Sequence, residues 1–151
     1  MPPAQALPFK GRLVEGDPDE IPPSVALSLT EASPIRFSYR EELTHNERHT
    51  ALWMTALAPS TYFSTPLGEY YVTAFATLSI YNGDKVIGSY TAKARVSRTY
   101  TLYAEPTHAE LEHQARDAVR AKIDAQLAND TDRLNDAIAE STRAAGPSLN
   151  R

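Results

Sequence analysis

Two neighbouring segments near the middle of the chain alternate between apolar and polar side chains. In YYVTAFATLSI, residues 70–80, the even positions are apolar and the odd positions mostly polar, with Phe75 among the odd set. In KVIGSYTAKARVSRTYTLY, residues 85–103, the even positions are again mostly apolar, and Arg98 interrupts them. Because side chains of a strand point alternately to opposite faces, each segment predicts a long strand with one apolar face, and together they predict a hairpin.

The Asn-Gly pair at 82–83 suggests a two-residue hairpin turn, but the faces of the flanking strands argue against it. Directly opposed residues of an antiparallel pair share a face, and this turn would set the even positions of one strand against odd positions of the other. A loop over 81–83 places Leu78 opposite Val86 and restores the match, as does an odd loop extended through 85. We therefore expect an odd-length, bulged turn with its glycine in the left-handed conformation.

The upstream half carries weaker patterns. IRFSYREEL, residues 35–43, alternates well and predicts a half-buried antiparallel strand. Residues 44–58 fit two interpretations: a helix that begins with the capping box Thr44–Glu47, or a second strand with THNER as the turn before it. We favour the strand. Short apolar patterns at 24–29 and around 11–15 indicate two further short strands.

An apolar stripe with a spacing of four residues follows Pro106. Its members are Leu111, Ala115, Val119, Ile123 and Leu127, and Leu134 and Ile138 continue it. The stripe predicts an amphipathic helix over 107–128, begun by the capping box Thr107–Glu110. Asn129–Thr131 predicts a break before a short helix at about 131–142, and the Gly-Pro pair at 146–147 predicts the end of ordered structure.

These elements predict an α+β fold, with a mostly antiparallel sheet of about four or five strands and the long C-terminal helix packed on one face. Small side chains on the inward strand face would let the helix approach closely: Ala74, Ala76, Gly88, Ala92 and Ala94. The length of 151 residues suits one domain, and the early clustering of the 11 prolines predicts an arm or loop outside the core over 1–34. A single α+β domain over 35–145 and a loose tail over 146–151 complete the expected organisation.

Composition narrows the functional classes. A formal net charge of −4 argues against nucleic-acid binding, which normally requires a basic surplus. The absence of cysteine excludes disulfides, thiolate zinc sites and cysteine nucleophiles. No run approaches the ~20 apolar residues that span a bilayer, and MPPAQALPFKGR lacks the apolar region of a signal peptide. Two expectations stay open: a cytoplasmic protein, or an exported one whose leader preceded this sequence.

No motif predicts catalysis or a cofactor. His45 and His49, with Glu47 between them, have metal-ligand spacing only on a helix, and they lack an evident third ligand, so we expect a solvated turn and no metal. Four titratable residues open the long helix: His108, Glu110, Glu112 and His113. Acidic residues there suit the helix dipole, so we assign the group to helix-start electrostatics and expect no enzyme.

Aromatic and basic side chains offer the remaining candidates. Lys93, Arg95 and Arg98 could form a small basic patch, although a solvated sheet face explains them more simply. The aromatic residues that could form an interaction surface are Tyr62, Phe63, Tyr71, Phe75 and Tyr81. Packing within the molecule is the simpler interpretation of these residues as well.

The segment from Ala76 to Ile138 resembles the C-terminal half of small envelope lipoproteins of the YajG type from Gram-negative bacteria. The matching features are the strand ATLSIYNGDK, the return strand SYTAKARV and the stretch AKIDAQLANDTDRLNDAI, residues 121–138. Members of that family carry a signal peptide and a lipidated cysteine, which this sequence lacks. The resemblance implies a domain on the periplasmic face of the outer membrane, attached to the membrane only through a lipid anchor outside this sequence. It implies no catalytic residues.

Two functions follow from these expectations. The first is a non-enzymatic cell-envelope lipoprotein domain that acts as an adaptor, scaffold or assembly subunit, with a protein partner or self-association into a homo-oligomer. The alternative is a small-molecule or lipid carrier with a cavity between the sheet and the C-terminal helix. A cavity filled by Tyr90, Tyr100, Val119 and Ile123 would argue against the carrier.

Overall fold

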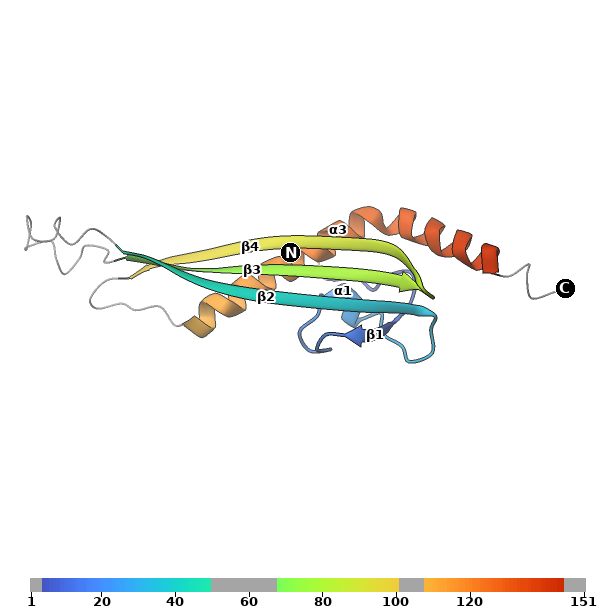
Figure 1. Cartoon of the computed structure of the whole chain (residues 1–151), viewed down its shortest axis with the longest axis horizontal. Helices are drawn as coiled ribbons and strands as arrows, with labels where there is room; N and C mark the ends of the chain where they lie inside the picture. Colours follow the sequence, from blue (N-terminus) through green and yellow to red (C-terminus); the bar gives the residue numbers. More distant parts are fainter. Residues whose placement is uncertain (1–3, 50–67, 101–107, 146–151) are drawn as a thin grey trace, which may run out of the picture. The chain divides into compact units, whose positions relative to one another are not determined.

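The computed structural model describes residues 4–49, 68–100 and 108–145 (Figure 1). Its elements are β1 (Arg12–Glu15), α1 (Pro23–Ala26), β2 (Ile35–His49), β3 (Gly68–Asn82), β4 (Lys85–Tyr100) and α3 (His108–Ala145). The strands form one four-stranded sheet in the order β1-β2-β3-β4, in which β1 runs parallel to β2 and the other strands are antiparallel. The predicted α+β fold, with a mostly antiparallel sheet and a long C-terminal helix, is confirmed.

Contacts along the chain separate into two compact units. Unit 1 comprises residues 1–41, 76–92 and 120–151, and unit 2 comprises 42–75 and 93–119. Each unit combines segments that are distant in the sequence, because the long strands and α3 contribute residues to both.

The core of each unit joins the inward strand face to its own part of α3. In unit 1 the fully or nearly buried apolar residues of these elements are Ile35, Phe37, Tyr39, Ala76, Leu78, Ile80, Ile87, Tyr90, Ile123, Leu127 and Leu134. In unit 2 they are Val72, Ala74, Ala94, Leu111, Ala115 and Val119. The predicted helical stripe is therefore confirmed from Leu111 to Leu134, while Ile138 is half-buried.

The N-terminal segment of unit 1 is part of the core, which corrects the expectation of an arm outside it. The short strand predicted around 11–15 is present as β1, and Leu13 pairs with Phe37 of β2. The backbone of Gly11 donates a hydrogen bond to the carbonyl of Ser28 at 3.0 Å. Ile21 and Val25 are 4% and 0% exposed, so the proline-rich sequence folds back and contributes apolar side chains to the interior.

The strand expected at 24–29 is wrong, because this segment contains the short helix α1 instead. Pro23 occupies the first helical turn, where a missing N–H costs nothing and the fixed φ suits a helix. The Ser24 hydroxyl and backbone N–H both donate to the Asp124 carboxylate on α3, within unit 1. Burial in this segment does not follow its apolar alternation, since Ser24 and Ser28 are buried while Leu27 is 57% exposed.

Strand β2 continues to His49, beyond the predicted end at residue 43. The turn expected at THNER is wrong, and so is the helical alternative over the part of 44–58 that the structure describes. Ile35, Phe37 and Tyr39 are buried as predicted, while side chains from Thr44 to Glu47 are exposed. The remainder of the 44–58 prediction lies outside the described residues.

The turn between β3 and β4 corrects the predicted loop length. Asn82 ends β3 and Lys85 begins β4, so the turn consists of Gly83 and Asp84 and is not odd-length. Gly83 has φ +64°, which confirms the predicted left-handed glycine. The buried residues near the start of β4 include Ile87, which has an odd number, whereas farther along they are Tyr90 and Ala94, which have even numbers. One extra residue inserted in the strand shifts the alternation in this way. Because of this shift, the even positions of β3 and most even positions of β4 share the inward face, which is the match that the longer loop was predicted to provide.

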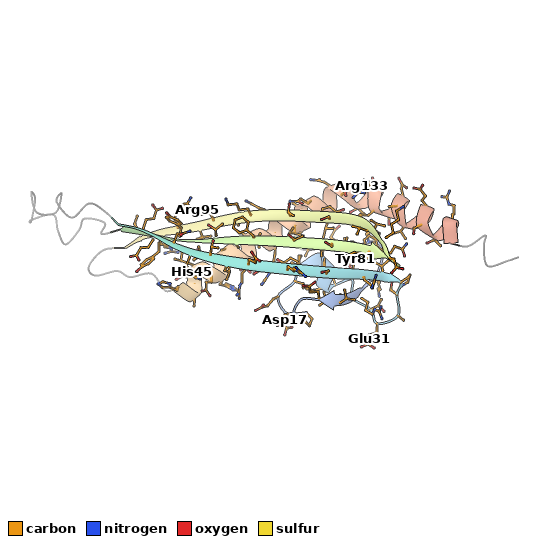
Figure 2. The ribbon with its side chains drawn as sticks, viewed as in Figure 1. Asp17, Glu31, His45, Tyr81, Arg95 and Arg133 are labelled. Carbon is orange, nitrogen blue, oxygen red and sulfur yellow. The ribbon has the colours of Figure 1, made fainter. Side chains whose placement is uncertain are left out.

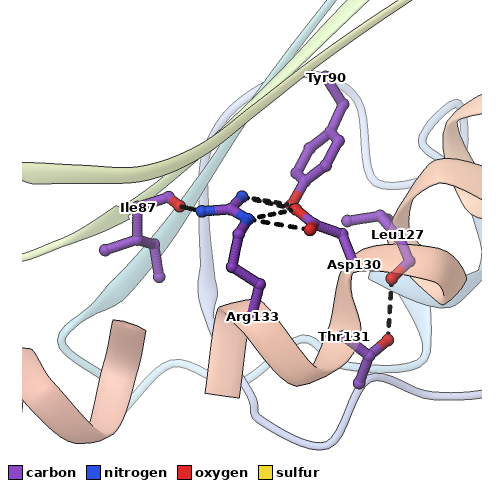
Figure 3. Close-up of polar contacts among 6 residues, drawn as sticks. All are labelled: Ile87, Tyr90, Leu127, Asp130, Thr131 and Arg133. Atoms are coloured by element: carbon purple, nitrogen blue, oxygen red, sulfur yellow. Dashed lines mark hydrogen bonds and ion pairs between the residues drawn. The ribbon is translucent and has the colours of Figure 1, made fainter. Parts of the chain in front are cut away.

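Helix α3 is continuous from His108 to Ala145, so the break predicted at Asn129–Thr131 is wrong. The Thr131 hydroxyl donates to the carbonyl of Leu127 at 2.8 Å, one turn earlier, and therefore does not cap a new helix (Figure 3). The Asp130 carboxylate accepts hydrogen bonds from the Tyr90 hydroxyl on β4 and from Arg133. The Asp130 carboxylate is therefore engaged outside the helix backbone, and the bond from Thr131 to the preceding turn is one that a threonine inside a continuous helix can make.

Candidate interaction surface

The outward face of β3 carries the aromatic side chains that the sequence singled out. Tyr71, Phe75 and Tyr81 occupy odd positions of β3, opposite the buried even positions. Phe75 is 41% exposed, and the two tyrosines are half-buried. Tyr62 and Phe63 lie outside the described residues, so their part of the predicted surface is not placed.

In unit 2 each outward aromatic ring has a basic side chain from β4 above it. The Lys93 ammonium lies 5.2 Å from the centre of the Phe75 ring, and the Arg95 guanidinium lies 3.8 Å from the centre of the Tyr71 ring. Figure 2 labels Arg95 on β4. Such a pair contributes about 0.5–1 kcal/mol at an exposed site, enough to favour one orientation of a long side chain. We call Tyr71, Phe75, Lys93 and Arg95 the aromatic–basic face.

The third aromatic residue has a structural environment in unit 1. The Arg36 guanidinium lies 5.6 Å from the centre of the Tyr81 ring, and it also donates to the carbonyl of Gly83 and faces Asp84 at 3.8 Å. Arg36 thus ties the β3–β4 turn to β2. Tyr81 is assigned to this turn and not to the aromatic–basic face.

The basic patch predicted from Lys93, Arg95 and Arg98 is divided between two environments. Arg98 faces Glu110 of α3 at 3.4 Å, which leaves Lys93 and Arg95 as the basic members of the outward face. Strand alternation could have found both ring pairs, since Lys93, Arg95, Tyr71 and Phe75 all occupy odd positions of neighbouring strands.

A second polar cluster in unit 2 joins residues that the sequence treated separately. The His45 imidazole on β2 lies 3.0 Å from the Glu112 carboxylate on α3, and its ring centre is 6.1 Å from that of His108. The ring centre of Tyr70 on β3 lies 5.0 Å from that of His108. His45, Tyr70 and His108 border an open pocket of about 200 Å³, which is smaller than most ligand sites. Figure 2 labels His45.

This cluster does not assemble into a metal site. Within residues 4–49, 68–100 and 108–145, no group of three His, Asp or Glu side chains is placed to hold a metal ion. The side chain of His49 is not among those described. His113 faces Asp117 one turn along α3 at 3.2 Å, an arrangement that suits the predicted helix-start electrostatics.

Three of the polar contacts that fix α3 to other elements in unit 1 involve a carboxylate. Ser24 and Asp124 form the first, and burial raises the pKa of the Asp124 carboxyl while the hydrogen bonds from Ser24 lower it in part. The second joins Tyr39, Glu41 and Arg120. The Arg120 guanidinium lies 3.3 Å from the Glu41 carboxylate, with only 13% and 12% of these side chains exposed.

The third contact joins Tyr90, Asp130 and Arg133 (Figure 3). Burial, then the hydrogen bond to Asp130, raises the pKa of the Tyr90 hydroxyl to about 12. Hydrogen bonds from Arg133 and Tyr90 hold the pKa of the Asp130 carboxyl below its usual value. In all three contacts the shifted pKa values have structural causes within the fold.

The carrier interpretation required an enclosed cavity between sheet and helix. Val119 and Ile123 are fully buried, and Tyr90 is 6% exposed, so these side chains fill interior positions that such a cavity would need. No observation favours a carrier over an adaptor. The carrier remains a prediction from the sequence.

No α-helix among the described residues is both long and apolar enough to cross a membrane. No protein-family model matches the chain, and no curated protein matches it either. Among solved structures it is similar to the rare lipoprotein B of Shewanella oneidensis, with 12% identity over 73% of this chain and 69% of that one. The TM-score of 0.27 is too low for this likeness to support a shared fold or function.

Proposed function

We propose that the chain is a non-enzymatic domain of a cell-envelope lipoprotein that acts as an adaptor or assembly subunit by binding a partner protein through the aromatic–basic face. The envelope location is supported by the resemblance of residues 76–138 to YajG-type lipoproteins. Protein binding is supported by one structural observation, namely the two cation–aromatic pairs on the outward sheet face of unit 2. Aromatic and arginine side chains are the types enriched at protein interfaces.

Exposure distinguishes this face from ordinary packing. Phe75 is 41% exposed, although the inward residues on either side of it, Ala74 and Ala76, are 0% and 3% exposed. The basic side chain above it covers one side of the ring while keeping its own charge at the surface. A partner could bury the rest of the ring and pair with the cations in the same contact.

Photo-crosslinking tests the proposal in the cells from which the gene comes. A benzophenone side chain at position 75 should capture one defined protein, identified by mass spectrometry. The same group at Val86, which is 52% exposed and lies in unit 1, is the matched control and should not capture that protein. Equal capture at both positions, or none at position 75, would contradict the proposal.

Charge reversal adds a second arm. Lys93→Glu with Arg95→Glu should abolish the adduct at position 75. Lys85→Glu with Arg143→Glu changes the net charge by the same amount at exposed positions in unit 1 and should leave the adduct intact. For the envelope location, a native gene that encodes a leader and a lipidated cysteine ahead of this segment would support the proposal, and fractionation of the native protein to the cytoplasm would contradict it.

A further inference from the structure

Strand β4 is the last strand in the order of the sheet, so one of its edges has no neighbouring strand among the described residues. In unit 1, side chains of α3 bind the backbone of this edge. Arg133 donates to the carbonyl of Ile87 at 3.2 Å, and Gln126 donates to the carbonyl of Thr91 at 2.8 Å (Figure 3 shows the first). The helix therefore protects part of the edge from pairing with another strand.

The carbonyl of Thr91 fixes the direction of the backbone groups that follow. In an antiparallel strand the N–H and C=O of one residue point to the same edge, and successive residues alternate between edges. Because Thr91 faces away from β3, the backbone groups of Arg95, Ser97 and Thr99 face away as well. Burial supports this regular alternation, since Tyr90 and Ala94 are buried while Thr91, Arg95 and Ser97 are exposed.

Among the described residues, side-chain hydrogen bonds to the backbone of this edge do not continue into unit 2. The residues that the structure describes donate no side-chain hydrogen bond to the backbone of Arg95, Ser97 or Thr99, in contrast to Ile87 and Thr91 in unit 1. This part of β4 therefore presents outward N–H and C=O groups in the spacing that an added strand requires.

The same residues determine the charge that an added strand would meet. Lys93 and Arg95 occupy the odd positions whose side chains belong to the aromatic–basic face, and the Phe75 and Tyr71 rings orient their cations. A residue directly opposite each cation would place its side chain on the same face. Carboxylates at alternate positions of the added strand would fit Lys93 and Arg95, and apolar residues between them would extend the inward side next to Ala94 and Val96.

We propose that the β4 edge from Lys93 to Thr99 binds an extended acidic segment of a partner protein by β-strand addition, with alternating carboxylates and apolar side chains. The inference rests on the proposed adaptor function and specifies how its partner binds. The backbone edge supplies the hydrogen bonds, and the aromatic–basic face supplies the selection for acidic residues.

A second copy of this chain does not fit the edge. Antiparallel pairing of β4 with its own copy would bring the cations of Lys93 and Arg95 close to the same residues of the other strand. Like charges directly opposite each other disfavour pairing, so the residues that select an acidic strand also oppose self-association through this edge.

Hydrogen exchange of the full chain tests strand addition directly. The probe is the capped peptide acetyl-Val-Glu-Val-Glu-Val-Thr-amide, and its counterpart with lysine in place of glutamate is the control. At a peptide concentration of about ten times its Kd, the amides of Arg95, Ser97 and Thr99 should exchange about tenfold more slowly, because only the unbound fraction exchanges. The intervening amides, already paired with β3, should change much less.

Three outcomes of this experiment contradict strand addition. These are equal protection by the acidic and lysine peptides, protection spread equally over odd and even residues, and no protection although the acidic peptide binds. Sedimentation of the chain alone is a further check, since a dimer that protects the same three amides would assign the edge to a second copy and also overturn the proposal.

A proline variant separates this inference from the adaptor function. Ser97→Pro removes an outward N–H but none of the bonds to β3, a change that edge strands tolerate, and Ser97→Ala is the matched control that keeps the N–H. Retained exchange protection at even positions of β4 would verify the fold. Strand addition predicts that Ser97→Pro, but not Ser97→Ala, loses both peptide binding and the cellular adduct at position 75. If the adduct survives Ser97→Pro but disappears on charge reversal, strand addition is refuted and the adaptor function is retained. If the adduct is absent from the parent and from every variant, both proposals are refuted.

Discussion

Replacing Gly88 with alanine would place a methyl group between two side chains of unit 1 that have little freedom to move. A Cβ built at this position lies 2.9 Å from Cε2 of Tyr90 and 3.0 Å from Cδ2 of Leu134. Leu134 is fully buried in α3, and Tyr90 is 6% exposed with its hydroxyl bound to Asp130. The close approach of helix and strand predicted from small inward residues therefore depends here on the absence of a side chain.

The expected cost is the difference between two effects. Forcing a methylene-sized group into a packed interior costs about 1–3 kcal/mol. Replacing glycine with alanine also restricts the unfolded chain, which favours the folded state by about 0.4–1 kcal/mol. We therefore expect Gly88→Ala to lower the free energy of unfolding by about 1–2 kcal/mol, measured by urea denaturation with circular dichroism.

A double-mutant cycle with Leu134→Ala tests whether the cause is this contact. Leu134→Ala alone should cost about 2–5 kcal/mol, because it leaves a cavity. In the Leu134→Ala background, Gly88→Ala should cost about 1 kcal/mol less than in the parent chain, since the truncated side chain no longer meets the new methyl group. Additive effects within about 0.5 kcal/mol, or no loss from Gly88→Ala alone, would refute the close-packing argument.

Three further predictions concern single groups. Gly83→Ala should lower the free energy of unfolding by about 1 kcal/mol because its φ is +64°, although its Cβ would meet no atom within 4 Å; an unchanged urea midpoint would contradict this. Arg120→Met should cost about 3 kcal/mol by leaving the mostly buried Glu41 carboxylate without this partner, and a loss below about 1 kcal/mol in the same assay would show that solvent replaces the guanidinium. Because burial raises the folded-state pKa of Asp124 above 3.8, the charged carboxylate disfavours the folded state at neutral pH, a penalty that disappears as the pH falls below the ordinary value of 3.8. As the pH rises from acidic to neutral, Asp124→Asn should therefore lose less stability than the parent, and its side-chain oxygen can still accept the bonds from Ser24. Thermal unfolding measured from pH 3 to pH 7 tests this, and a constant difference in melting temperature between the two proteins would contradict it.

Periodicity predicted the parts of the fold that bury a continuous face. The alternation of residues 70–80 and the four-residue spacing from Leu111 onward each report which side of an element meets the core, and burial agrees with both. The break expected at Asn129–Thr131 was wrong, because the contact that decides it joins residues far apart in the sequence. Asp130 meets Tyr90, 40 residues earlier, and that contact removes the side chain from competition with the helix backbone.

The candidate surfaces divide in the same way. The pairs on the aromatic–basic face join adjacent strands of a hairpin, so strand parity was sufficient information to place them. The cluster of His45, His108 and Glu112 was not predictable, because β2 was expected to end before His45. Its members come together only when β2 extends to His49 and lies beside the start of α3 within unit 2.

The bond between Ser24 and Asp124 has a consequence for the order in which the chain can fold. Its partners are 100 residues apart, so the first helix of the sequence can reach its final position only after most of the polypeptide has been synthesised. Contacts of such long sequence separation slow folding, since a large loop must close before they form. During synthesis Ile21 and Val25 must remain without their final neighbours while the strands assemble, and the N-terminus, made first, would be among the last segments to settle.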